Sequence, residues 1–108
     1  MIVNVRTYTI VPRKMAAYLH LVEQLAMPVM KRHGFELLGY YVAKHGRLNQ
    51  VIHLWKYEDL GDLERKRTAR DADPDWAHYL TQTDGMVQDQ EDRIMAPASF
   101  SPGSQSPG

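Results

Sequence analysis

Four side chains that can bind a ligand or take part in a reaction are spaced so that two β-strands can bring them together. His53 and Trp55 alternate with aliphatic residues in the segment GRLNQVIHLWKYEDL, and Arg6 and Tyr8 alternate in the same way in IVNVRTYTI. Successive side chains of a strand point to opposite faces, so the members of each pair share a face. Arginine binds anionic or carbonyl oxygens, histidine donates or accepts a proton, and aromatic rings stack on ligands. These residues therefore predict a small-molecule site.

A tyrosine from a third strand is expected to join them. Tyr40 and Tyr41 are adjacent, so one faces the helices and the other faces the site, and the register of the hairpin decides which. The predicted ligand-binding set takes Tyr41 and consists of Arg6, Tyr8, Tyr41, His53 and Trp55. The alternative interpretation is that these side chains fill a dimer interface, where aromatic residues and arginine are enriched for their own reasons.

Composition excludes several classes of protein. The 108 residues carry 13 basic and 13 acidic side chains, and this zero net charge argues against a nucleic-acid partner. The absence of cysteine removes disulfides and thiolate chemistry, and it is typical of a cytoplasmic protein. No apolar run approaches a membrane span and no signal-peptide pattern opens the chain, so we expect no membrane partner. The five histidines lack metal-ligand spacing, and we expect neither a metal nor a cofactor.

The pattern of turns and periodicities predicts the elements that would position these side chains. Strands are expected at 2–10, 35–45, from 48 to 57, and 86–95. A helix is expected from Pro12 to about His33 with a kink or break at Pro28, and two shorter helices are expected after the N-caps Asp59 and Asp73. The order β-α-β-β-α-β predicts an α+β, ferredoxin-like fold with a four-stranded antiparallel sheet. One domain is expected over 1–100, followed by a flexible Pro/Ser/Gly tail at 101–108.

Alternation divides each strand into two faces, and the aliphatic face is the one that a core requires. Ile52 and Leu54 form a purely aliphatic face, as do Val3 and Val5 with the threonines that follow them. We expect these aliphatic faces to meet the helices as the core. The face with the histidine and the indole is then expected to lie away from the helices.

The chain resembles the NIPSNAP family over residues 2 to about 101. The resemblance is carried by four segments: RTYTIVPRKMAAYLHL, PVMKRHG, GRLNQVIHLWKYEDL and ADPDWAHYL. At one point Pro12-Arg13 stands where the family often has Pro-Gly. This family belongs to the dimeric α/β-barrel superfamily, so the resemblance implies that two protomers close a barrel by setting their sheets face to face. Arg6, Tyr8, His53 and Trp55 would then line the space between the two sheets.

Three functions from different classes are compatible with these residues. The first, which we favour, is a homodimer that binds a small molecule in a cleft between the sheet and the dimer interface. The second is a cofactor-independent enzyme of the monooxygenase or isomerase kind that uses His53 as a base, since related members of the superfamily include monooxygenases. The third is a structural or protein-interaction dimer whose barrel is filled by its own side chains.

Overall fold

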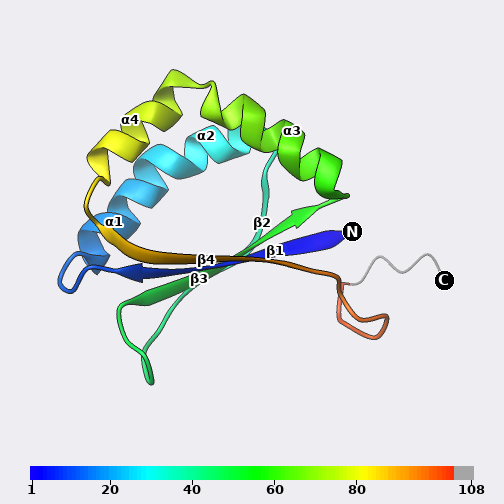
Figure 1. Ribbon diagram of the computed structural model, residues 1–108, viewed down its shortest axis with the longest axis horizontal. Helices are drawn as coiled ribbons and strands as arrows, with labels where there is room; N and C mark the ends of the chain where they lie inside the picture. The colour runs from blue at the N-terminus through cyan, green and yellow to red at the C-terminus, as the bar shows by residue number, and fades with distance from the viewer. Residues whose placement is uncertain (104–108) are drawn as a thin grey trace.

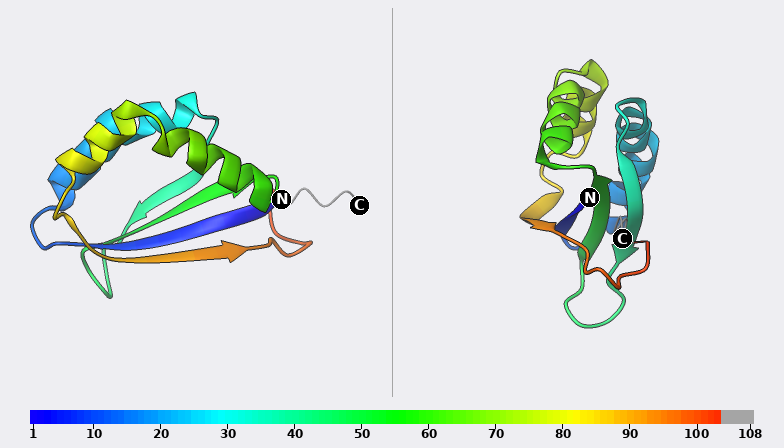
Figure 2. Two further views of the ribbon diagram at one scale, coloured as in Figure 1. Left: turned by 45° about the horizontal axis from the view of Figure 1, so that its top comes forward. Right: turned by 90° about the vertical axis from the view of Figure 1, so that its right-hand side faces the viewer.

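The structure is a computed structural model that describes residues 1–103, and its centre is one antiparallel sheet with strand order β2-β3-β1-β4. The strands are β1 (Ile2–Ile10), β2 (Glu36–Val42), β3 (Gln50–Tyr57) and β4 (Val87–Met95). All helices arch over the same face of this sheet (Figures 1 and 2). They are α1 (Met15–Leu21), α2 (Met27–Arg32), α3 (Leu60–Asp71) and α4 (Pro74–Gln82). The predicted ferredoxin-like order is confirmed.

The turn before α1 differs from the expectation. Pro12 is not the first helical residue, because the helix begins at Met15 after a turn. Arg13 in that turn has a φ of +74°, a left-handed conformation in which a side chain at Cβ is strained and glycine is not. A glycine at this position, as the resemblance to Pro-Gly suggests, would relieve that strain.

Pro28 neither breaks the first helical run nor stops it. A π-helical segment, Val22–Ala26, lies between α1 and α2, and the amide of Met27 donates to the carbonyl oxygen of Val22 five residues back. Proline has no amide hydrogen, and in a regular α-helix its ring presses on the carbonyl four residues earlier. The wider π turn removes that conflict one residue before the proline, and the run continues to Arg32.

The two predicted N-caps are confirmed. The carboxylate of Asp59 accepts a hydrogen bond from the amide of Asp62 at 2.8 Å, and that of Asp73 accepts from the amide of Asp75 at 3.0 Å. Pro74 is then the first residue of α4, where a missing amide hydrogen costs nothing. These caps fix where α3 and α4 begin, and so where their inward side chains lie.

The two faces of the sheet are partitioned as predicted, but the expectation of which face the helices cover was wrong. The covered face carries the histidine and the indole: Val51, His53, Trp55 and Tyr57 of β3 are all buried. On β1 the covered face carries Asn4 and Ile10, both fully buried, with Arg6 and Tyr8 between them. Large aromatic side chains fill the curved space beneath the helical arch, which shorter aliphatic side chains would leave partly empty.

The aliphatic face is therefore left uncovered in the protomer. Ile52 is 40% exposed and Tyr41 60% exposed, and Leu38 beside them is 48% exposed. Val5 of β1 lies opposite Leu54 of β3. Leu54 is two residues from Ile52 and shares its face of the strand. Such a contiguous apolar surface is unusual on a protein that works as a monomer.

Only part of the expected tail can be compared with the structure. The amide of Ser101 closes a turn by donating to the carbonyl oxygen of Ala98 at 2.9 Å, and residues 102–103 form a further turn. Residues 104–108, the rest of the predicted flexible tail, lie outside the described residues.

Candidate functional site

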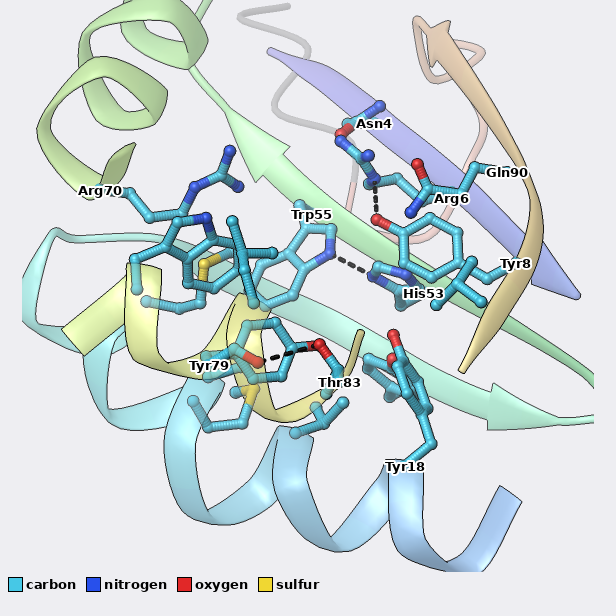
Figure 3. A pocket seen from close by; sticks show the side chains of 18 of the residues that line it. Asn4, Arg6, Tyr8, Tyr18, His53, Trp55, Arg70, Tyr79, Thr83 and Gln90 are labelled. Carbon is cyan, nitrogen blue, oxygen red and sulfur yellow. Dashed lines mark hydrogen bonds between the residues drawn. The ribbon is translucent and has the colours of Figure 1, made fainter. Parts of the chain in front are cut away.

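A pocket of about 430 Å³ lies between the covered face of the sheet and the helices (Figure 3). Its floor comes from β1, β2 and β3, whose side chains strand periodicity brings to one face. Its walls come from the first helical run, including the π-helical segment, and from α4. The residues on the floor are Asn4, Arg6, Tyr8, Tyr40, His53, Trp55 and Tyr57, and those on the walls include Tyr18, Val22, Ala26, Met27, Met30, Trp76 and Tyr79.

His53 is held in one tautomer with an unused donor. The indole Nε1 of Trp55 donates to Nδ1 of His53 at 2.7 Å, and an indole nitrogen can only donate. Burial, followed by the positive charge of Arg6, lowers the pKa of His53 to about 3, so the ring is neutral at pH 7. A neutral imidazole that accepts at Nδ1 carries its proton on Nε2. That Nε2 is buried and has no hydrogen-bond partner among residues 1–103.

The imidazole is fixed in place by two tyrosines. The ring of Tyr40 stacks on that of His53 at a centroid distance of 4.5 Å, and the ring of Tyr8 meets it edge-on at 4.7 Å. Such aromatic pairs each contribute about 0.5–1.5 kcal/mol beyond the area they bury. His53 therefore has a defined ring orientation, and its free donor has a defined direction.

Arg6 and Tyr8 supply further donors beside this histidine. Arg6 is the direct cross-strand neighbour of His53. Its Nε donates to the hydroxyl oxygen of Tyr8 at 2.8 Å, which leaves the hydroxyl hydrogen of Tyr8 available to another acceptor. The closest contact of its terminal nitrogens to a described carboxylate is 3.8 Å, from Nη1 to Oδ2 of Asp92. This separation is too long for a hydrogen bond, so both terminal nitrogens can serve a ligand.

A polar network closes this end of the pocket. Asn4 donates to a carboxylate oxygen of Asp92, and Arg67 of α3 reaches both residues, at 3.0 Å from Oδ1 of Asn4 and 3.2 Å from Oδ2 of Asp92. Burial raises the pKa of Asp92, but the hydrogen bond from Asn4 and the charges of Arg6 and Arg67 outweigh it and lower the pKa overall. Asp92 is therefore a carboxylate at neutral pH, and its oxygens are already occupied by this network.

The opposite wall of the pocket is rich in phenols and apolar side chains. Burial raises the pKa of Tyr18 and Tyr79 on this wall, and of Tyr40 on the floor, so all three hydroxyls stay protonated and can donate or accept. Trp76 lies on the same wall, and the guanidinium of Arg70 covers its ring at 4.4 Å from the centroid. This combination offers an apolar surface with a few fixed polar groups, which is typical of small-molecule sites.

Four of the five predicted residues line this one pocket, and the fifth does not. Arg6, Tyr8, His53 and Trp55 are among its lining residues. The choice of Tyr41 was wrong: it pairs with Ile52 on the uncovered face, while Tyr40 pairs with His53. A β-bulge between Leu37 and Gly39 shifts the register of β2 and decides the matter. The pocket that these four residues line lies under the helices of one protomer, on the opposite side of the sheet from the uncovered face.

Several lining residues were not singled out from the sequence as functional. Tyr18, Met27 and Met30 belong to the apolar stripe of the first helical run, and nothing in that stripe separates a pocket wall from ordinary core. Asn4 shares its strand face with Arg6, and a polar residue on a face that also carries isoleucines was the signal available. Among the acidic residues of β4, Asp92 is the one that lies directly opposite Arg6.

The family model for NIPSNAP matches residues 3–102, nearly the whole chain. The chain belongs to the NIPSNAP family. A NIPSNAP-family protein of unknown function from Agrobacterium tumefaciens is 34% identical, with a TM-score of 0.90 over 94% of this chain and 92% of that chain. Protein NipSnap of Drosophila melanogaster is 31% identical over 72 residues, which are 67% of this chain and 26% of that protein. The matched segments span between about a quarter and about a third of the length of the curated NIPSNAP relatives.

More distant structures share the fold of this NIPSNAP chain. A candidate monooxygenase from Lactobacillus acidophilus is 15% identical, with a TM-score of 0.71 over 87% of this chain and 43% of that chain. No helix in the described part of the chain has the length and apolar character needed to cross a membrane. Within residues 1–103, no three histidine, aspartate or glutamate side chains converge as a metal site would require.

Proposed function

We propose that this NIPSNAP protein binds a small molecule in the pocket between its sheet and its helices. The observation that carries the proposal is the buried, unpartnered Nε2–H of His53 at the wall of a 430 Å³ pocket. A buried donor without an acceptor costs about 1–3 kcal/mol. Proteins retain few such groups, and each is explained most simply by a partner that binds there. A ligand atom that accepts this hydrogen bond removes the cost.

We further propose that the protein is a homodimer through its uncovered aliphatic face. The aromatic face of β3 lies under the helices and is not available to a partner. The support now comes from the opposite face, where Leu38, Tyr41 and Ile52 are exposed together. A second copy related by a two-fold axis would cover this face with the same face of its own sheet and remove both from water. Each protomer would keep its own pocket, because the pocket lies on the other side of the sheet.

An enzyme of the monooxygenase or isomerase kind stays the alternative, but the hydrogen bonding of His53 disfavours its simplest form. A base needs a free lone pair, and the lone pair of Nδ1 already accepts from Trp55. The free nitrogen carries a hydrogen and is suited to hold an oxygen atom. Binding therefore has more support than proton abstraction by His53.

Native mass spectrometry of the freshly purified protein tests the proposed binding function. We expect a species heavier than the bare chain, which loses the extra mass on denaturation. Ala77→Phe places a bulky ring at the pocket wall and should lose the extra mass, whereas Ala69→Phe, on the exposed side of α3, should keep it. Bare protein in every preparation, or equal retention in both variants, would contradict ligand binding in this pocket.

A further inference from the structure

We infer that the ligand of this pocket is a small carboxylate on a flat apolar body, with the carboxylate held by Arg6 and His53. This inference rests on the proposed binding function and adds the chemical class of the ligand. It is carried by three features of the pocket: the kind of polar atoms at one end, the balance of charge there, and the surface and size of the rest.

The polar end of the pocket offers a ligand three adjacent donors, beside the side-chain amide of Gln90, which can donate or accept. The buried Nε2–H of His53 has no partner, and the terminal nitrogens of its cross-strand neighbour Arg6 are 3.8 Å or more from a carboxylate. The hydroxyl of Tyr8 already accepts from Arg6, so it too turns a hydrogen outward. A ligand group that only accepts hydrogen bonds fits three adjacent donors, and a carboxylate has four acceptor positions on two oxygens.

The positive charges at this end outnumber the negative charges by one. Two guanidinium groups, those of Arg6 and Arg67, share the single carboxylate of Asp92. Asp92 lies nearer to Arg67, at 3.2 Å, than to Arg6. Arginine stays protonated in proteins, so Arg6 keeps a charge that the described residues neutralise only weakly. A monoanionic ligand would complete the balance, and a guanidinium fork matches a carboxylate in shape.

The remainder of the pocket suits an apolar body rather than a second charge. Trp55, Trp76, Met27 and Met30 present rings and thioethers to it. Its volume of about 430 Å³ is what roughly fourteen water molecules occupy in liquid water. A bicyclic aromatic acid is of that order of size. Methionine side chains adapt to flat rings of differing outline, so the feature selected most strictly is the carboxylate.

The experiment compares 2-naphthoate with 2-naphthamide by isothermal titration calorimetry on the full chain at one protein concentration. The two probes have nearly the same shape and differ at the polar end alone: the amide is neutral, and an NH₂ donor replaces one of the two acceptor oxygens of the carboxylate. We expect the wild type to bind 2-naphthoate at least about tenfold more tightly, as charge-assisted hydrogen bonds at a partly buried site imply. The affinity for 2-naphthoate should also fall as salt is added, and that for 2-naphthamide should not.

Two matched variants locate the effect. Arg6→Gln should weaken the binding of 2-naphthoate much more than that of 2-naphthamide, and so remove most of the preference for the carboxylate. Arg65→Gln removes the same charge from the exposed side of α3 and should keep the preference. The comparison of the two probes on the wild type decides the inference even where Arg6→Gln folds poorly.

The outcomes separate this inference from the proposed function. Equal affinities on the wild type, a preference for the amide, or no binding of 2-naphthoate in the millimolar range would each overturn the carboxylate. A preference that survives in Arg6→Gln would overturn the role of Arg6. A pocket that carries a neutral molecule in native mass spectrometry would leave the binding function standing while refuting the carboxylate.

Discussion

Acid should destabilise this protein through His53, and the size of the effect follows from the pKa. The folded-state pKa of His53 is lowered to about 3 by burial and by Arg6, whereas an unfolded histidine titrates near 6.5. Below pH 6.5 the unfolded chain binds a proton that the native chain does not bind. Stability is therefore fully present above pH 6.5 and is lost as the pH falls toward 3. Between pH 7 and pH 5 the loss due to this one group is about 2 kcal/mol.

Urea denaturation at pH 7 and pH 5 measures this loss. His53→Gln does not titrate, so its free energy of unfolding should fall by about 2 kcal/mol less than that of the wild type over the same interval. His45→Gln removes a histidine that is exposed in the hairpin loop, and it should retain the wild-type loss. All proteins are compared at one concentration, since dimerisation would make stability depend on it.

Equal losses of stability in His53→Gln and in the wild type would contradict a neutral His53 in the folded protein. If His53→Gln loses as much stability as the wild type between pH 7 and pH 5, the histidine is not held neutral in the folded state. The assignment of its proton to Nε2, and with it the free donor in the pocket, would then fail. Carboxylates with lowered pKa, such as Asp73 at about 2, lose their stabilising effect only below pH 4 and do not disturb the interval.

Three further predictions concern the frame around the pocket. Arg13→Gly should raise the free energy of unfolding in urea denaturation by up to about 1 kcal/mol. Glycine relieves the left-handed strain, and the freedom it adds to the unfolded chain offsets part of that gain. A lower free energy of unfolding would show that the arginine side chain makes a stabilising contact. Asp59→Ala should cost about 1 kcal/mol in the same assay by removing the cap of α3, and no change would mean that the cap is dispensable. Leu54→Asp on the uncovered face should convert the dimer into a folded monomer, as measured by analytical ultracentrifugation. Leu48→Asp in the exposed hairpin loop should leave the dimer intact. A monomeric wild type would contradict the proposed interface.

The sequence predicted the elements well because their signals are local. Asp59 and Asp73 are caps by virtue of their own side chains, and alternation along β1 and β3 correctly grouped Arg6 with Tyr8 and His53 with Trp55. These features depend on neighbours a few residues away, so they can be inferred before the fold is known.

The orientation of the sheet could not be inferred in the same way. Period-two alternation divides a strand into two sets of side chains but assigns neither set to the helices. Both sets in β3 are largely apolar, so the aliphatic set around Leu54 was taken as the core. The bulge at Leu38 decides between Tyr40 and Tyr41. The adjacent Gly39 is compatible with a bulge, but the register depends on pairing with β3. The pocket itself arises from how far the helices arch above the sheet, which is a tertiary property.

A crystal structure of the protein as purified, without added ligand, would test the central claim most directly. We predict a non-protein molecule in the pocket between the sheet and the helices, with an acceptor atom about 2.8–3.0 Å from Nε2 of His53. A pocket closed by its own side chains, or an Nε2 that donates to a residue of the protein, would contradict the claim.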